Sequence, residues 1–171
     1  MVKALNAAKS AARGIVLAAA ILATPVAVFT ATGCTSNTNT PAPKSLYDRL
    51  GGDPAISAVV DDFVNRAAAD PAVNFTRKGV EGAPQWDPTP ENVAILKKHL
   101  TEFIEVATGG PQTYEGRPDK DVHKGMKITD AEFNAIAADL VASLNKFNVP
   151  QQEQNDLIAV VKTTYPDVVQ P

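Results

Sequence analysis

Apolar residues recur three and four positions apart in several stretches of the chain, which is the spacing of one face of an α-helix. The first stretch spans residues 54–69, and the second opens at Thr89-Pro90 and closes at Gly109-Gly110-Pro111. Two more lie in the last third, separated by Asn148-Val149-Pro150, and the final one runs to about Thr164. No stretch alternates apolar and polar residues as a half-buried strand does. The pattern predicts an all-α fold.

Residues typical of helix ends place several boundaries. Residues 46–50 indicate a short helical turn that Gly51-Gly52 stops, and Asp53-Pro54 is typical of an N-cap followed by a first helical residue. Thr129 and Glu132 have the spacing of a capping box, in which each side chain hydrogen-bonds the backbone amide of the other residue. A helix is therefore expected to begin just after Thr129.

Two long irregular segments interrupt the helices, residues 70–89 and residues 111–128. The first contains three prolines and no apolar period, so we expect a loop with at most one short turn of helix. Loops of this length are uncommon in compact domains and are often functional. A plain four-helix bundle needs neither segment. Both are explained if the helices spread around a bulky, flat ligand.

The N-terminal segment differs from the rest of the chain. Three basic residues precede an uncharged run over residues 15–33, and the first acidic residue is Asp48. This pattern is typical of a secretory signal, and Pro25 within the run argues against a permanent membrane-spanning helix. We therefore expect an exported protein with a signal peptide over residues 1–33.

Cys34 is the only cysteine and directly follows this run. The residues before it resemble the lipobox of bacterial lipoproteins, whose cysteine is acylated and becomes the N-terminus, although Ala31 stands where leucine is more common. The resemblance implies a lipid anchor to a bacterial membrane, on its periplasmic or extracellular face. The alternative is an ordinary signal peptide whose removal leaves a free thiol. Residues 34–44 would then form a flexible tether rich in Thr, Asn and Pro.

The remaining domain, residues 45–171, is acidic. The full sequence has a net charge of −3, and residues 1–34 hold three basic and no acidic residues, so their removal takes −3 to −6. This charge, without a basic stripe, argues against nucleic acid as a partner. The sequence also contains no Ser-His-Asp, Walker or HExxH arrangement, so it offers no motif of those enzyme classes.

An ordered set of short motifs resembles the group I truncated haemoglobins, whose helices fold two over two around a haem. The motifs are LYDRLGG at 46–52, VDDF at 60–63, GGP at 109–111 and YEG at 114–116. His123 follows Tyr114 by nine residues, which is the spacing of that family's proximal region. The resemblance covers nearly the whole domain except residues 76–90, which look like an insertion. It implies a truncated globin-like, two-over-two helical sandwich.

The resemblance further implies a non-covalent haem b with His123 as the proximal ligand of the iron. Histidine is the usual globin ligand, and the chain has only two histidines. Cys34 has no CxxCH neighbour, so a covalent c-type attachment is not expected. The residues expected to contact the cofactor are Phe63, Val64, Phe75, Leu96, Lys97, Leu100 and Phe103, with Ile128, Phe133, Ile136 and Leu140 on the proximal side.

The distal side departs from the family pattern. Group I proteins usually hold O2 with a tyrosine and a glutamine, at positions that are Val64 and Leu100 here. Neither side chain can donate a hydrogen bond. Their absence removes about 1.5–3 kcal/mol of stabilisation unless another group replaces them, so O2 is expected to be held weakly. The family's usual methionine near the proximal ligand is replaced by Asp119.

His99 precedes Leu100 on the expected distal helix and has three possible roles. In some relatives a histidine at the matching position ligates the iron directly. Alternatively, His99 hydrogen-bonds a ligand, or it points to solvent because it only borders the apolar face. Trp86 and Tyr47 could also reach the distal side.

Basic residues are expected to pair with the haem propionates, because carboxylates at a pocket mouth favour cations. The candidates are Arg77, Lys78, Lys97 and Arg117.

The main hypothesis is a haem protein that binds O2, NO or CO at the iron. The alternatives are a bis-histidine electron-transfer protein with an unidentified redox partner and an NO-detoxifying or peroxidase-like enzyme. Peroxidase chemistry favours a distal acid–base residue, for which His99 is the candidate. A haem-free structural lipoprotein is disfavoured because His123 is present.

Overall fold

The structure is a computed structural model that describes residues 42–169. The expected signal peptide, Cys34 and residues 35–41 of the tether lie outside the described residues. Every helix within residues 42–169 lies in the compact unit Lys44–Pro171. Within residues 42–169, no helix has both the length and the apolar composition needed to cross a bilayer.

The described residues form seven helices and no strand, which confirms the all-α prediction. The helices are α2 (Leu46–Leu50), α3 (Gly52–Ala69), α4 (Pro90–Ala107), α5 (Asp119–Val122), α6 (Asp130–Lys146), α7 (Gln151–Lys162) and α8 (Tyr165–Val168).

Side-chain caps explain two of the long helices. Thr89 caps α4 by accepting a hydrogen bond from the Asn92 amide, and Pro90 follows as the first helical residue. Thr129 and Glu132 form the predicted capping box of α6. These ends depend only on nearby residues, so the sequence predicted them correctly.

The start of α3 differs from the prediction. Its N-cap is Gly51 rather than Asp53, and Gly51 also ends α2. The left-handed backbone of Gly51 (φ 98°) lets the chain reverse between the two helices without an intervening loop. Asp53 instead lies in the first turn of α3, where its carboxylate accepts a hydrogen bond from the Ser57 hydroxyl at 3.0 Å.

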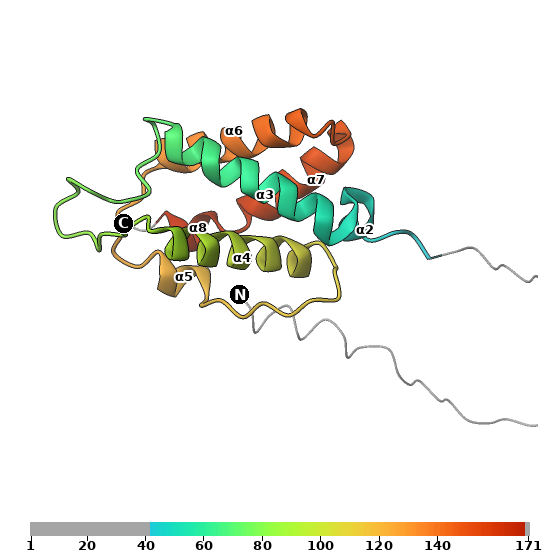
Figure 1. The fold of residues 1–171 in the computed structure, drawn as a ribbon, viewed down its shortest axis with the longest axis horizontal. Helices are drawn as coiled ribbons and strands as arrows, with labels where there is room; N and C mark the ends of the chain where they lie inside the picture. The colour runs from blue at the N-terminus through green and yellow to red at the C-terminus, as the bar shows by residue number, and fades with distance from the viewer. Residues whose placement is uncertain (1–41, 170–171) are drawn as a thin grey trace, which may run out of the picture. The chain divides into compact units, whose positions relative to one another are not determined.

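Helix α3 is the centre of the domain and packs against both α4 and α6 (Figure 1). Helix α2 packs against α3 and α7, and α6 packs against α7. The buried core consists mainly of side chains of α3, α4, α6 and α7: Leu50, Ile56, Val59, Val60, Phe63, Val64, Ala67, Ile104, Leu140, Leu144 and Leu157. Burial of these apolar surfaces provides the main favourable term in folding.

Helix α8 was not predicted. The expected last helix ends at Lys162, and Tyr165–Val168 forms a separate turn. The Tyr165 ring packs edge-on against Phe133 with centroids 5.1 Å apart, and its hydroxyl hydrogen-bonds Asp130 at the start of α6. Helix α8 also packs against α5, and it therefore helps to position the segment that carries His123.

Candidate functional site

His123 lies directly after the short helix α5. Its Nδ1 is 2.8 Å from the backbone carbonyl oxygen of Asp119, one helical turn earlier. A carbonyl can only accept a hydrogen bond, so Nδ1 carries the proton and the lone pair is on Nε2. The ring is half-buried, and Nε2 makes no hydrogen bond to the described residues. This is the state that a histidine needs to ligate a metal.

The segment around His123 is short and depends on its neighbours. Pro118 precedes α5, which has only four residues and packs against α8. Asp119 occupies the position of the family's methionine, and burial raises the pKa of its carboxyl. The sequence predicted His123 but not the Asp119 carbonyl that orients it. Asp119 precedes His123 by four residues, so this contact could have been predicted if a helical turn had been recognised before His123.

The four residues expected on the proximal side divide into two kinds. Phe133 and Leu140 of α6 are buried, at 6% and 3% exposure. Ile128, just before α6, and Ile136 within it are only partly buried. Ile128 and Ile136 therefore keep exposed apolar surface that a flat apolar group would cover.

Most of the expected distal residues lie on α3 and α4. Phe63 and Val64 of α3 are buried, whereas the three apolar residues of α4 are partly buried: Leu96, Leu100 and Phe103. A cavity of about 400 Å³ lies between the second half of α3, the loop and the first half of α4. The structure brings Val64, Phe75 and Leu96 together in its lining, but not Leu100, Phe103 or His123.

His99 lies against the segment that follows α4. Its Nδ1 is 3.3 Å from the Glu102 carboxylate, and its ring meets the Tyr114 ring edge-on with centroids 6.1 Å apart. Tyr114 also packs edge-on against Phe103, again at 6.1 Å. The sequence identifies Tyr114 only by its place in the YEG motif. It does not predict this contact, because the loop conformation decides which side chains of α4 Tyr114 covers.

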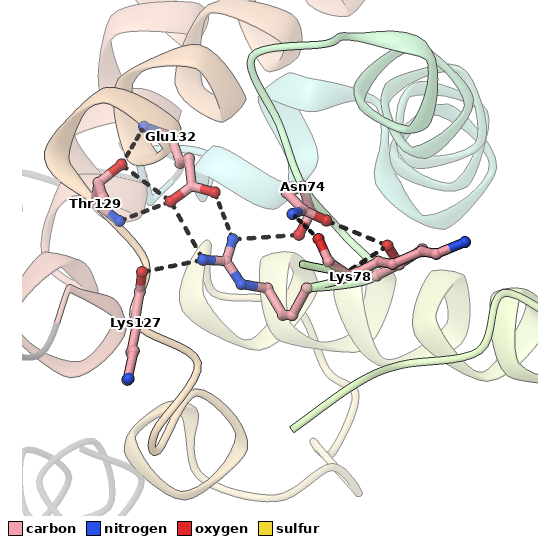
Figure 2. Close-up of polar contacts among 7 residues, drawn as sticks. Asn74, Lys78, Lys127, Thr129 and Glu132 are labelled. Carbon is pink, nitrogen blue, oxygen red and sulfur yellow. Dashed lines mark hydrogen bonds and ion pairs between the residues drawn. The ribbon is translucent and has the colours of Figure 1, made fainter. Parts of the chain in front are cut away.

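Arg77 does not lie at a pocket mouth as expected for a propionate partner. It is only 4% exposed and has a left-handed backbone (φ 53°). Its guanidinium forms an ion pair with Glu132 at 2.5 Å and donates to the backbone carbonyls of Asn74 at 3.2 Å and Lys127 at 3.0 Å (Figure 2). The other residues of this network are Thr76, Lys78 and Thr129. Arg77 thus fastens the inserted loop to the start of α6.

The other basic candidates have different surroundings. The Lys97 ammonium lies 2.5 Å from the Asp61 carboxylate and 3.3 Å from the Asn65 side-chain oxygen. Lys78 and Arg117 are exposed, and the Arg117 carbonyl accepts a hydrogen bond from the Tyr114 hydroxyl at 2.9 Å. Exposed basic groups can pair with a carboxylate, but none of these contacts assigns that role.

A second cavity, of about 440 Å³, is polar and includes Lys97 in its lining. Glu105 also lines this cavity and is only 2% exposed. The pKa of its carboxyl is raised mainly by burial and secondarily by the negative charge of Asp53. In the part of the chain that the structure describes, no three His, Cys, Asp or Glu side chains are arranged to hold a metal ion. This cavity therefore offers no alternative metal site to the one at His123.

The residues present fit a haem. His123 offers one oriented nitrogen, which is the donor that globins use. Six of the expected contact residues are apolar and only partly buried: Phe75, Leu96, Leu100, Phe103, Ile128 and Ile136. A macrocycle between the two sides would bury these surfaces.

Comparison with known proteins gives a consistent assignment. The model of the family described as bacterial-like globin matches residues 45–169. The group 1 truncated hemoglobin of Mycolicibacterium paratuberculosis is 32% identical over 126 residues, covering 74% of this chain and 85% of that protein. The corresponding protein of Synechocystis is 31% identical over 121 residues, covering 68% and 86%.

Solved structures agree with the sequence comparison. Truncated hemoglobin from Tetrahymena pyriformis, in its Fe(III) form, has a TM-score of 0.63 and 27% identity and covers 75% of this chain and 100% of its own. The 2/2 hemoglobin of Synechococcus, in the cyanomet state and with covalently attached heme, has a TM-score of 0.61 and 29% identity, with coverages of 74% and 98%. The chain therefore belongs to the bacterial-like globin family, as a haem-binding homologue of the group 1 truncated haemoglobins.

Proposed function

We propose that His123 holds the iron of a non-covalently bound haem and that a diatomic ligand binds on the opposite side. The observation that carries this proposal is the 2.8 Å contact between His123 Nδ1 and the Asp119 carbonyl, which directs the lone pair of Nε2 away from α5. When bound, haem supplies an iron coordination position for O2, NO or CO. The protein orients the proximal nitrogen, surrounds the ring with apolar side chains and limits the entry of water.

The distal side lacks the two donors that related proteins use. Val64 is 3% exposed and lines the cavity, and Leu100 packs against the core. Neither side chain can donate a hydrogen bond to a polar ligand. We therefore expect weaker retention of O2 than in a site with a tyrosine and a glutamine.

We further propose that His99 is not an iron ligand in the resting protein. Its ring has partners in Glu102 and Tyr114, at 3.3 Å and 6.1 Å, and both contacts would have to break for it to swing toward the iron. This arrangement favours an open, five-coordinate site over the bis-histidine alternative. A five-coordinate site suits ligand binding better than electron transfer, because a coordination position is free.

Visible absorption of the dithionite-reduced, ligand-free protein tests this proposal. We expect one broad band, typical of five-coordinate iron, with the same spectrum in a His99→Leu variant. Sharp, split bands in the native protein that collapse in the variant would show instead that His99 ligates the iron. A native protein without any haem absorption would contradict the proposal as a whole.

We propose that the protein is exported and held at a bacterial membrane through acylated Cys34. The support is the sequence of the signal segment and the tether that follows it. When the full-length chain is expressed in bacteria, Cys34→Ser should move it from the membrane fraction to the soluble fraction. Mass spectrometry of the native protein should find acyl chains on Cys34, and an unmodified thiol there would refute the anchor.

A further inference from the structure

The inserted loop contributes an aromatic residue to the cavity on the distal side. Trp86 lines this cavity together with Val64 of α3 and Leu96 of α4, and both of these belong to the expected haem contacts. Trp86 is the only tryptophan in the chain. Because Trp86 lines the cavity, a molecule that enters the cavity can come close to its side chain.

The indole N–H is a donor that the protein does not use. The other polar side chains of the cavity, Asn65, Asn74 and Thr76, each donate a hydrogen bond to a protein oxygen, at 3.4, 3.1 and 3.2 Å. Trp86 is partly buried, and its side chain makes no hydrogen bond to any of residues 42–169. Because indole can only donate, its natural partner is an acceptor that enters the cavity, such as water or a ligand.

Trp86 is held in place from two sides. Its backbone amide donates to the Thr76 carbonyl at 3.1 Å, which closes the loop on itself. Its ring is tilted by 51° against the Phe75 ring, with centroids 6.3 Å apart. A donor fixed in this way loses less conformational entropy when it binds a ligand than a donor on a free loop would.

The inserted loop is also attached to the start of α6 and to the segment that precedes it. Arg77 forms an ion pair with Glu132 of α6, and the Lys127 ammonium donates to the Glu81 carbonyl at 2.6 Å (Figure 2 shows the Arg77 network). These contacts join the loop to the segment between His123 and α6. The wall that contains Trp86 is therefore a fixed part of the site.

We propose that Trp86 is the distal hydrogen-bond donor of this protein, in place of the donors missing at Val64 and Leu100. The indole N–H donates to the outer atom of a diatomic ligand with negative charge on that atom, of which O2 is the example. The inference rests on the proposed function, because it requires haem iron on His123. One neutral donor stabilises less than a pair, so retention of O2 remains moderate.

The donor also determines selectivity between ligands. An N–H group favours a ligand that accepts hydrogen bonds, such as O2, and contributes little to CO, which is a poor acceptor. A wall that acted only by size would affect both ligands alike. This difference separates a hydrogen bond from simple packing.

The test is a Trp86→Phe variant of the full holoprotein, which keeps an aromatic ring and removes the donor together with part of the indole volume; the comparison of O2 with CO separates these two effects. We expect O2 to dissociate about tenfold faster, the size of one such hydrogen bond, with CO binding rates unchanged. In the native CO complex, the C–O stretching band should shift when water is replaced by D2O, and this shift should vanish in the variant. The shift needs only native protein, so it tests the proposal even if the variant folds poorly.

Two outcomes would overturn the proposal: equal changes for O2 and CO, or no change in either. A native C–O band that is insensitive to D2O would do the same. In apoprotein, haem addition should strongly quench the fluorescence of the single tryptophan, and unquenched emission would place Trp86 away from the site. Failure of the proposed function is distinct, because a native chain without haem absorption would show it before any variant is made.

Discussion

Replacement of His123 by glycine should remove tightly bound haem from the protein, and added imidazole should restore it. In the proposed function the His123 ring supplies the protein's nitrogen to the iron, and glycine would leave space in which free imidazole can bind. Loss of partners that merely orient a metal ligand lowers affinity about 10–100-fold, so loss of the ligand itself should exceed ~100-fold. Haem titration followed in the visible spectrum measures this directly.

The matched control is His99→Gly, which removes the other histidine of the chain. We expect this variant to keep haem with native affinity, because His99 contacts Glu102 and Tyr114 rather than the proximal side. Circular dichroism should show that both variants keep their helices. Equal haem affinity in His123→Gly and in the native protein would show that the iron has a different protein ligand.

Replacement of Arg77 by methionine should lower the free energy of unfolding by about 3 kcal/mol, since removal of one partner of a buried ion pair leaves the other charge uncompensated. Methionine fills similar volume but cannot donate to Glu132 or to the carbonyls of Asn74 and Lys127. Urea unfolding of native and variant apoprotein measures the change. The variant's Trp86 emission should also shift to longer wavelength as the loop loosens.

The loss should depend on pH. Burial acts to raise the pKa of Glu132, but hydrogen bonds from Arg77 and Thr129 outweigh it and hold the pKa below its ordinary value. A lowered folded-state pKa stabilises the protein above the unfolded pKa, near 4.5, and this stabilisation disappears as the pH falls through the folded pKa. The native protein should therefore lose more stability in acid than Arg77→Met does.

Two controls separate the ion pair from other effects. Glu132→Gln keeps a side chain that can complete the capping box with Thr129 but leaves the buried Arg77 guanidinium without a counter-charge, so its loss should be comparable to that of Arg77→Met. Lys98→Met removes the pairs that this exposed side chain forms with Glu115 and Glu102, and pairs of exposed side chains contribute below about 1 kcal/mol each. Equal losses in Lys98→Met and Arg77→Met would show that burial of Arg77 has no special effect.

The sequence by itself determined the long helices and their ends. Residues such as Thr89, Pro90 and the pair Thr129–Glu132 act on the backbone within three positions, so their effect can be predicted without knowledge of the rest of the chain. The same locality explains the error at α3. Gly51 serves two helices at once, and this role of Gly51 depends on the angle at which they meet.

Motifs that resemble those of the family predicted the role of His123, but the tertiary structure decided which residues surround it. Helix α5 has four residues and α8 has four, too short for an apolar period to reveal, and each is stabilised by packing against the other. Neither could be predicted as a helix from its own residues. The oriented state of His123 follows from the turn that α5 makes.

Only the tertiary structure decided the environment of the inserted loop. Arg77 looked like a surface cation, yet its partner Glu132 is 55 residues away in sequence, and no local pattern records such a pairing. Trp86 likewise reaches the cavity because the loop folds back between α3 and α4. The signals that begin and end a helix act between residues close in sequence, so they can be recognised in the sequence alone. Burial and long-range ion pairs depend on segments that come together only after the helices have packed.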